Sequence, residues 1–312
     1  MPIPLISHPN YSFDFPHSHR FPMEKFRLLH DYLNEKGIAN PRNIFSPEPA
    51  SNELLELAHC PDYLQRFFTN QFTDKELKRM GLPWSEGLLK RSLISPAGTY
   101  LTAQFALKEG IACHLAGGTH HAHYDFASGF CVLNDLAVTA KALLNPTGDD
   151  HPGNNNIGCQ KVLIFDCDVH QGDGTARILE SDPSVFTCSI HCGQNFPAKK
   201  AQSDLDVEVP KLTRDDRYLA LVWQTLQHAI AVSRPDIVLY DAGVDIYEHD
   251  PLGLLSISVA GIRERDRLVL SVCRDMDLPV ATVIGGGYDD DRKALAKRHA
   301  MVIEEADKLF RD

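Results

Sequence analysis

Four short apolar runs in the second half of the chain constrain the fold most strongly. Each has Gly, Asp or His at or near its end, and they read KVLIFDCDV, SVFTCSIHC, PDIVLYDAG and LPVATVIGGG. Runs that are apolar on both faces are typical of strands in a buried parallel sheet. Helical patterns accompany the later runs, over residues 214–233, 260–276 and 292–311. This alternation predicts one α/β domain over residues 1–312, with a central, mostly parallel β-sheet flanked by helices.

The first half of the chain is predicted to be mainly helical. Helices are expected in MEKFRLLHDYLNEKG, with Gly37 as the stop, and in SNELLELAH and GTYLTAQFALKEG, with breaks at prolines between them. A further helix is expected from Asn134 to Leu144, followed by a polar loop over residues 145–158.

Composition narrows the class of protein. The chain has 42 acidic and 31 basic side chains, and this acidic balance argues against binding nucleic acid through its phosphates. Eight cysteines occur without a CxxC pair, which is typical of free, buried thiols in a reducing compartment. The start lacks the pattern of a signal peptide, and no apolar run approaches the roughly 20 residues needed to span a bilayer. We therefore expect a soluble, cytoplasmic protein without membrane or nucleic-acid partners.

The first apolar run ends in candidate metal ligands. In DCDVHQGDG, Asp168 and His170 alternate and would share one face of the strand. A carboxylate and an imidazole together suit a divalent cation such as Zn²⁺. Asp173 follows a glycine turn that would fold it back toward these residues. The alternative interpretation is a strand end that is merely capped by polar side chains.

The third run supplies a further candidate ligand. Asp245 follows the glycine turn of YDAGVDIYEHDP and would complete a set of three ligands. Three protein ligands leave one position open for water, as a catalytic zinc requires. Such a water could lose a proton near neutral pH, and the ion would polarise a carbonyl. Glu248, His249 and Asp250 are interpreted as polar loop residues, with Asp250–Pro251 starting a turn.

Two other motifs carry candidate catalytic groups. The last run ends in IGGGYDDD, where three glycines would let the backbone pass close to a ligand and would leave Tyr288 exposed. Its phenol could donate a hydrogen bond to an oxyanion; an ordinary surface tyrosine is the alternative. The stretch AGGTHHAHYDFASGF holds His120, His121 and His123. By themselves these histidines could be metal ligands, proton carriers or a polar loop.

Taken in order, these motifs resemble the zinc-dependent histone deacetylase family of the arginase–deacetylase superfamily. The matching pieces lie within residues 98–292 and read GGTHHAHYDFASGFCVLND, FDCDVHQGDG, SIHCG, YDAGVDIYEHDPLGLLSIS and GGGY. Gln171 stands where more familiar members usually have a second histidine. This glutamine and the stretch AGVDIYEHDPLGLLSIS are most similar to the class IV branch and its bacterial relatives.

The resemblance implies a ligand set and a catalytic tyrosine. Asp168, His170 and Asp245 would bind Zn²⁺, with Fe²⁺ as the alternative metal. Tyr288 would face the oxygen of the tetrahedral intermediate.

The resemblance also implies two His–Asp pairs. His120 and His121 would carry protons and not bind the metal, with Asp166 orienting His120 and Asp173 orienting His121. A carboxylate on the far nitrogen would fix the tautomer of each imidazole and raise its basicity. His121 would act as base and then acid, and His120 mainly as an electrostatic partner.

Further residues are assigned by the same resemblance. Gly129 and Phe130 would form one wall of a narrow acyl-lysine channel, and Phe196 the opposite wall. Pro197-Ala198 stands where the family usually has Pro-Gly. A structural K⁺ would be held by oxygens, several of them backbone carbonyls, at Asp166, Asp168, His170, Ser189 and Ile190.

The remaining histidines receive structural interpretations. His114 lies in an apolar, strand-like segment and is interpreted as a core histidine. His123 is interpreted as loop structure. A second zinc site formed by Cys188, His191 and Cys192 is not expected.

These observations lead to one main function. We expect a metal-dependent amidohydrolase that removes acetyl or longer acyl groups from the ε-amine of lysine in a protein or peptide. The alternative substrate is an acetylpolyamine or another acylated small amine. A binuclear manganese hydrolase is disfavoured because Asp173 has the wrong spacing and VDIYEHD offers no DxD pair. A pseudoenzyme is disfavoured because every ligand position and Tyr288 are filled.

Overall fold

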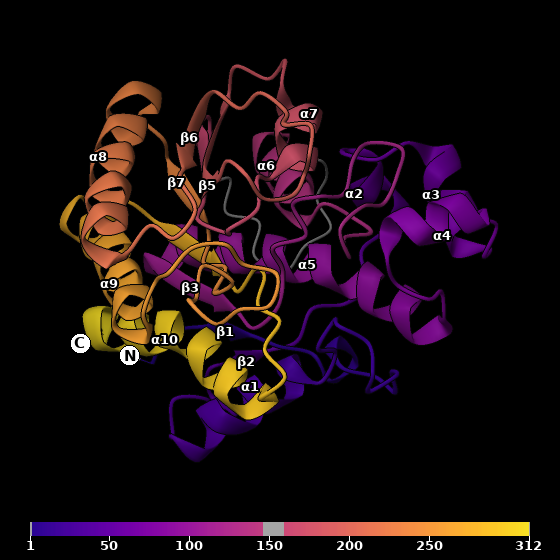
Figure 1. Ribbon diagram of the computed structural model, residues 1–312, viewed down its shortest axis with the longest axis horizontal. Coiled ribbons are helices and arrows are strands. Elements are labelled where there is room, and N and C mark those ends of the chain that lie inside the picture. Colours follow the sequence, from indigo (N-terminus) through magenta and orange to yellow (C-terminus); the bar gives the residue numbers. More distant parts are fainter. Residues whose placement is uncertain (1, 146–158, 312) are drawn as a thin grey trace.

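The computed structural model describes residues 2–145 and 159–311 (Figure 1). The polar loop expected over residues 145–158 therefore lies outside the described residues, except for Asn145. The described residues form a single α/β domain, as the sequence predicts. None of their helices has both the length and the hydrophobicity needed to cross a membrane.

An eight-stranded sheet forms the centre of the described residues. Its strand order is β2-β1-β3-β8-β7-β4-β5-β6, and every neighbouring pair is parallel. The strands are β1 (Leu5–Ile6), β2 (Ile44–Phe45), β3 (Ile111–His114), β4 (Val162–Asp166), β5 (Val185–Cys192), β6 (Leu205–Val209), β7 (Ile237–Asp241) and β8 (Val280–Val283). The four predicted runs are β4, β5, β7 and β8, which are neighbours in the sheet, so the predicted parallel sheet is confirmed.

Helices surround this sheet. They are η1 (Pro9–Tyr11), α1 (Lys25–Glu35), α2 (Asn52–Glu56), α3 (Pro61–Phe68), α4 (Asp74–Met80), α5 (Glu86–Glu109), α6 (Asp135–Leu144), α7 (Asp173–Leu179), α8 (Asp215–Ser233), α9 (Val259–Asp275) and α10 (Arg292–Phe310). The predicted helix that begins at Asn134 is α6, whose N-cap is Asn134; its side chain accepts a hydrogen bond from the Ala137 N–H.

One helix contradicts the sequence prediction. Breaks were expected at the prolines between SNELLELAH and GTYLTAQFALKEG. Helices are interrupted before Pro61 and around Pro83 as expected, but α5 runs without interruption through Pro96. Proline removes one backbone hydrogen bond and usually kinks or ends a helix. The residues around Pro96, including Ile94 and Thr99, are buried, so tertiary packing holds both halves of the helix in place.

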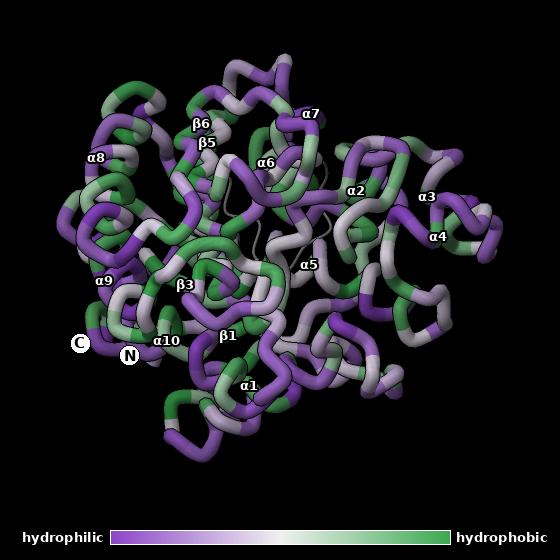
Figure 2. Tube along the Cα trace, viewed as in Figure 1, coloured by the Kyte–Doolittle hydropathy of each residue, from purple (hydrophilic) through white to green (hydrophobic). Residues whose placement is uncertain are grey.

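The two faces of the sheet carry different helices and different halves of the core. Phe165 and Tyr240 lie in a large cluster with residues of α1, α8, α9 and α10. Their strand neighbours Ile164 and Leu239 lie in a second cluster, which includes residues of α5 and α6. Both faces are therefore covered, as the continuous apolar runs require. Figure 1 shows α8, α9 and α10 together on one side of the molecule, and Figure 2 shows hydrophobic and hydrophilic residues alternating along the surrounding helices.

The carboxyl ends of the central strands meet at one edge of the sheet. Asp166, the last residue of β4, is the register partner of Ser189 in β5 and of Asp241 in β7. Asp241 in turn pairs with Val283 in β8. Ligand sites of open α/β sheets lie at this edge, and the loops that follow these strands carry the candidate site residues.

Candidate active site

Three side chains at this edge converge on one point. One ligand atom from each of Asp168, His170 and Asp245 lies within 4.8 Å of the others. His170 Nδ1 is 3.0 Å from Asp168 Oδ1 and 3.1 Å from Asp245 Oδ2. All three residues are buried. Asp168 and His170 follow β4 and Asp245 follows β7, so two neighbouring strands bring the expected residues together.

Backbone N–H groups hold the two carboxylates in place. Asp168 Oδ1 accepts from the His170 N–H at 2.9 Å, and Asp168 Oδ2 accepts from the Gly286 N–H at 2.7 Å. Asp245 Oδ1 accepts from the Val169 N–H at 2.9 Å. A Cβ at Gly286 would lie 2.1 Å from Asp245 Oδ2 and 2.5 Å from Asp168 Oδ2. The second glycine of GGGY is therefore required by the close approach of its backbone to both carboxylates.

The chemistry of this donor set suits a divalent cation. A neutral imidazole carries one N–H, yet His170 Nδ1 faces two carboxylate oxygens. Burial and the charge of Asp168 raise the pKa of Asp245 to about 7. Burial disfavours a charged His170, but its contacts with Asp168 and Asp245 raise its pKa to about 10. One Zn²⁺ or Fe²⁺ ion could replace the protons that these groups otherwise have to share.

His120 makes one His–Asp contact beside this set. Its Nδ1 is 2.7 Å from Asp166 Oδ2, and its Nε2 is 3.9 Å from Asp168 Oδ1. Because an ionised carboxylate can only accept, the imidazole donates from Nδ1. Burial opposes a charge on His120, but Asp166 and Asp168 hold its pKa well above the ordinary value. The surroundings of His120 therefore favour the charged imidazole.

His121 makes a second His–Asp contact but has the opposite charge preference. Its Nδ1 is 2.6 Å from Asp173 Oδ1, and its ring centroid is 4.2 Å from that of His120. Burial and the neighbouring charge of His120 lower the pKa of His121 to about 4, although Asp173 acts in the other direction. His121 is therefore neutral at neutral pH and able to accept a proton. The other carboxylate oxygen, Asp173 Oδ2, is 3.1 Å from His123 Nε2, a contact that the sequence interpretation of His123 missed.

Tyr288 is buried, so the prediction of an exposed tyrosine was wrong. Only 9% of it is accessible, because its ring lies against those of Phe130 and His170, with centroids 5.7 Å and 6.4 Å away. Burial, together with the charge of Asp245, raises the pKa of Tyr288 well above the ordinary value. The phenol therefore keeps its proton and can act as a hydrogen-bond donor beside the three candidate ligands.

The expected channel residues border the same rings. Phe196 is 42% exposed and meets His121 edge to face at 4.8 Å between centroids. Phe130 is half-buried against Tyr288. Gly129 has φ of 53°, and a Cβ there would lie 2.6 Å from a His121 ring carbon and 3.2 Å from one of Phe196. Gly129 is thus needed for both its backbone conformation and its close contacts.

The expected monovalent-cation residues are divided between two neighbouring strands: Asp166, Asp168 and His170 lie at or after the end of β4, and Ser189 and Ile190 lie in β5. Asp166 and Ser189 are register partners, and Ile190 follows Ser189 in β5. Ser189 Oγ is 3.0 Å from His191 Nδ1. The K⁺ assignment remains a prediction from the sequence resemblance.

His114 and the cysteines have the structural surroundings expected of them. His114 is fully buried in β3, with its ring nitrogens 2.9 Å from Thr99 Oγ1 and 2.6 Å from the Tyr11 hydroxyl. The described residues include all eight cysteines; each is a free thiol, and all but Cys60 are buried as expected.

Sequence reasoning missed a buried lysine next to the site. Lys25, the first residue of α1, donates from Nζ to the Gly285 carbonyl at 3.0 Å and lies 5.9 Å from the centroid of the Tyr288 ring. Burial lowers its pKa to about 8. The helix pattern did indicate that Lys25 is buried, because Lys25 lies four residues before Leu29 and therefore falls on the same buried face of α1.

Sequence reasoning also missed a third carboxylate near His120. Asp241 is fully buried, and it forms a compact group with His120 and Asp166. Its Oδ1 accepts from the Gly243 N–H at 3.2 Å, while Oδ2 has no partner within residues 2–145 and 159–311. Burial and the charge of Asp166 raise the pKa of Asp241 well above the ordinary value. The YDAG motif therefore contributes a buried carboxyl group as well as a turn.

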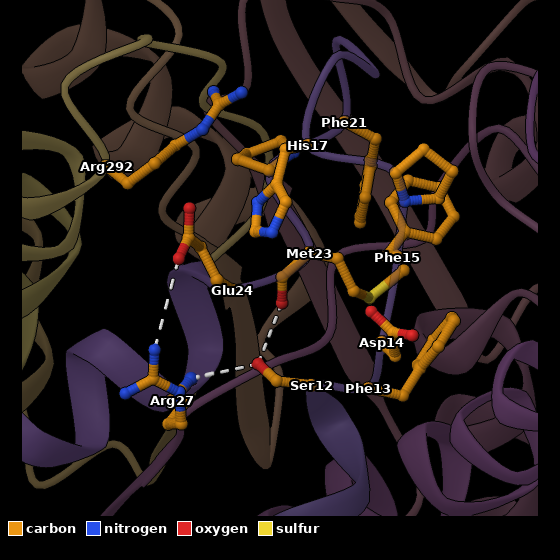
Figure 3. A pocket seen from close by; sticks show the side chains of 12 residues that line it. Ser12, Phe13, Asp14, Phe15, His17, Phe21, Met23, Glu24, Arg27 and Arg292 are labelled. Carbon is orange, nitrogen blue, oxygen red and sulfur yellow. Dashed lines mark hydrogen bonds and ion pairs between the residues drawn. The ribbon is translucent and has the colours of Figure 1, made fainter.

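A separate surface pocket of about 320 Å³ lies where the N-terminal segment meets the start of α10 (Figure 3). Its lining includes Phe13, Phe15, Phe21, Met23, Arg27 and Arg292. Ser12 also lines it, donating to the Met23 carbonyl and accepting from the Arg27 N–H. None of the candidate metal ligands lines this pocket.

A family model and curated proteins match nearly the whole chain. The model of the histone deacetylase domain matches residues 19–306. An uncharacterized protein of Picosynechococcus sp. is 44% identical over 310 residues, which cover 99% of this chain and 100% of that protein. Histone deacetylase 2 of Arabidopsis thaliana is 28% identical, over 86% of this chain and 70% of its own. The acetoin utilization protein AcuC of Staphylococcus xylosus is 27% identical, over 88% of this chain and 74% of its own.

Solved structures share the fold at low sequence identity. The HD domain of HDA15 superposes with a TM-score of 0.77 at 20% identity, over 96% of this chain and 90% of that one. An HDAC homolog complexed with SAHA gives a TM-score of 0.77 at 21% identity, over 98% of this chain and 84% of that one.

Proposed function

The chain belongs to the histone deacetylase family, and on that premise we propose that it is a lysine deacylase, a metal-dependent amidohydrolase that removes acetyl or longer acyl groups from the ε-amine of lysine. The observation that carries this proposal is the convergence of Asp168, His170 and Asp245 beside two His–Asp pairs and a buried tyrosine. We assign this activity to residues 1–312 as one catalytic domain, closest to the class IV branch in its motifs.

Asp168, His170 and Asp245 are the proposed ligands of the catalytic metal. Zn²⁺ is the proposed ion, with Fe²⁺ as the alternative, and K⁺ is proposed as a second, structural cation near Asp166 and Ser189. When bound, the divalent ion would polarise the amide carbonyl and make a water molecule more acidic.

His121 is the proposed base. Because its imidazole is neutral at neutral pH, it can take a proton from the attacking water at Nε2, while its Nδ1 donates to Asp173. His121 can then return that proton to the nitrogen of the departing lysine amine. The charged His120 would contribute positive potential next to the developing oxyanion without having to change its protonation state.

Tyr288 is the proposed donor to the oxyanion. Its raised pKa keeps the phenol protonated, so a hydrogen bond from its hydroxyl can strengthen as negative charge develops on the carbonyl oxygen. Phe130 and Phe196 would flank the aliphatic part of the lysine side chain, since both rings lie against catalytic candidates. A narrow aromatic passage would exclude water and hold the amide in line with His121.

A substrate panel tests this proposal. The metal-loaded protein is incubated with one peptide sequence that carries ε-acetyl-, ε-butyryl-, ε-octanoyl- or ε-myristoyl-lysine, and separately with acetylated polyamines. Hydrolysis of one or more peptides with a higher kcat/KM than any polyamine supports the lysine deacylase. A preference for acetylpolyamines would replace lysine by a small amine as the substrate, and no hydrolysis of any of these compounds would contradict the proposed reaction.

A further inference from the structure

The third histidine of the HHAH motif contacts the carboxylate that His121 also uses. His123 Nε2 is 3.1 Å from Asp173 Oδ2, while His121 Nδ1 is 2.6 Å from Asp173 Oδ1. Asp173 therefore bridges two imidazoles, one through each oxygen. Since the carboxylate has no proton to donate when it is ionised, both imidazoles must donate to it.

The ring of His123 is held in position by its surroundings. It stacks on Phe126 with centroids 4.1 Å apart and an interplanar angle of 18°. The His123 N–H donates to the Phe126 carbonyl at 2.9 Å. The guanidinium of Arg79 lies 3.9 Å from the centroid of the same Phe126 ring. The stack therefore presents His123 Nε2 to Asp173 with little freedom left in the side chain.

The backbone carbonyl of His123 is also held in place, by a buried histidine. The His123 carbonyl lies 3.0 Å from His59 Nδ1, and His59 Nε2 accepts from the Asn134 N–H at 2.8 Å. Because Nε2 of His59 must be the unprotonated nitrogen, Nδ1 carries the proton and donates to the carbonyl. His59 is fully buried, so this bond is protected from water.

Two donors orient a carboxylate more completely than one. Asp173 is the first residue of α7, and rotation about its last side-chain bond would exchange or misalign its oxygens. Burial opposes the charge of Asp173, but hydrogen bonds from His121 and His123 hold its pKa below the ordinary value. Without the second donor, the hydrogen bond from His121 would be the one side-chain contact in the described part of the chain that orients the carboxylate, and the group could rotate more freely against His121.

We propose that His123 is a positioning residue, which donates its Nε2–H to Asp173 Oδ2 and thereby holds Asp173 Oδ1 against Nδ1 of the catalytic base His121. This inference rests on the proposed function, because His121 is a base only in that reaction. It assigns to His123 a role that acts through Asp173, without contact to the substrate. The hydrogen bond, and not the stacked ring, is the feature that matters.

Two variants separate the hydrogen bond from the stacking. His123→Phe keeps a ring on Phe126 but removes the donor, and His123→Gln keeps an N–H donor but removes the ring. We expect His123→Phe to lower kcat about 10- to 100-fold with little change in KM or metal content. His123→Gln should stay within a few-fold of the wild-type kcat. His228→Phe, on the exposed face of α8, is the matched control and should leave kcat unchanged.

Other results with these variants would contradict the proposed role of His123. A wild-type kcat in His123→Phe would overturn the proposal, and so would a loss in His123→Gln as large as in His123→Phe. A large rise in KM or a loss of metal from a folded His123→Phe protein would assign His123 to the substrate or metal site instead.

A spectroscopic measurement tests the hydrogen bond from His123 to Asp173 without relying on an activity assay. In the wild-type protein labelled with ¹⁵N-histidine, the ring nitrogens of His123 are assigned through the bonds of their own side chain. We expect a protonated Nε2; an unprotonated Nε2 would overturn the proposal even where a variant fails to fold. An inactive wild-type protein with a protonated His123 Nε2 would contradict the proposed function and leave the hydrogen bond in place, so the two failures are distinguishable.

Discussion

The backbone N–H of Tyr288 donates a 2.8 Å hydrogen bond to Asp250 Oδ2, although the two residues lie 38 positions apart. Asp250 Oδ1 accepts from the N–H groups of Leu252 and Gly253 at 2.9 Å and 3.2 Å. One buried carboxylate thus joins the loop after β7 to the turn that carries the proposed oxyanion donor. Asp250 starts the predicted turn, and its other carboxylate oxygen also holds the backbone N–H of Tyr288 in position.

Replacing Tyr288 by phenylalanine tests the oxyanion assignment. The variant keeps the ring that packs against Phe130 and loses only the hydroxyl. Loss of one such donor typically costs a factor of about 10² to 10³ in kcat. Steady-state kinetics on an acetyl-lysine peptide, together with metal analysis, should show this loss at unchanged metal content. Normal turnover would remove Tyr288 from the mechanism.

Asp250→Asn tests the link between the two loops. An amide can supply only one acceptor oxygen, so either the turn at Leu252 or the Tyr288 N–H loses its partner. A buried donor left without a partner costs about 1–3 kcal/mol in the free energy of unfolding. Urea denaturation should show this loss, along with a reduced kcat. Asp290→Asn, whose side chain is fully exposed, is the control and should change neither quantity.

Lys25→Met tests the buried lysine. Its Nζ holds the Gly285 carbonyl, one residue before the glycine whose N–H binds Asp168. Freeing this carbonyl should shift the turn relative to the ligands and lower kcat about tenfold or more, because small misplacements near reacting groups are costly. Lys36→Met, an exposed lysine at the end of the same helix, should have no effect on kcat. Equal kcat values in both variants would assign Lys25 a purely structural role.

His59 predicts a specific pH dependence of stability. Burial lowers the pKa of His59 to about 4, and its ordinary value is 6.5. Because the folded-state pKa is depressed, the unfolded chain binds the proton first. The stability that His59 contributes is therefore present above pH 6.5 and is lost as the pH falls toward 4.

The size of this effect follows from the pKa difference. Between pH 7 and pH 5, the wild type should lose about 2 kcal/mol of unfolding free energy relative to His59→Gln, whose amide does not titrate. Chemical denaturation of both proteins at the two pH values measures it, and the other titrating groups cancel in the difference. Parallel stability curves for the two proteins would contradict the depressed pKa.

The central sheet was predictable because four of its strands lie in runs that are apolar on both faces. The local sequence alone predicts a strand at each of β4, β5, β7 and β8. The polar residues at the ends of these strands could be assigned to one edge of the sheet from the parallel topology alone. β1 and β2 are two residues long and have no measurable periodicity. β6 was missed because it is mostly half-exposed at the edge of the sheet and mixes polar with apolar residues.

The site residues that sequence reasoning missed come from packing between distant segments. Lys25 reaches Gly285 across 260 positions, and His59 reaches the His123 carbonyl across 64. Such contacts depend on how α1 and the loops before α3 dock, which no local pattern encodes. Tyr288 was predicted to be exposed because glycines beside it suggest an open turn, whereas Phe130 and His170 cover its ring.

Metal-dependent release of acetate tests the central claim most directly. The purified protein is freed of metal by a chelator, checked by metal analysis, and incubated with an ε-acetyl-lysine peptide before and after Zn²⁺ or Fe²⁺ is restored. We expect no acetate release from the metal-free protein, recovery with one equivalent of metal, and no recovery in Asp168→Ala, which should bind the metal poorly. Undiminished release by the metal-free protein, or none by the fully loaded wild type, would contradict the claim.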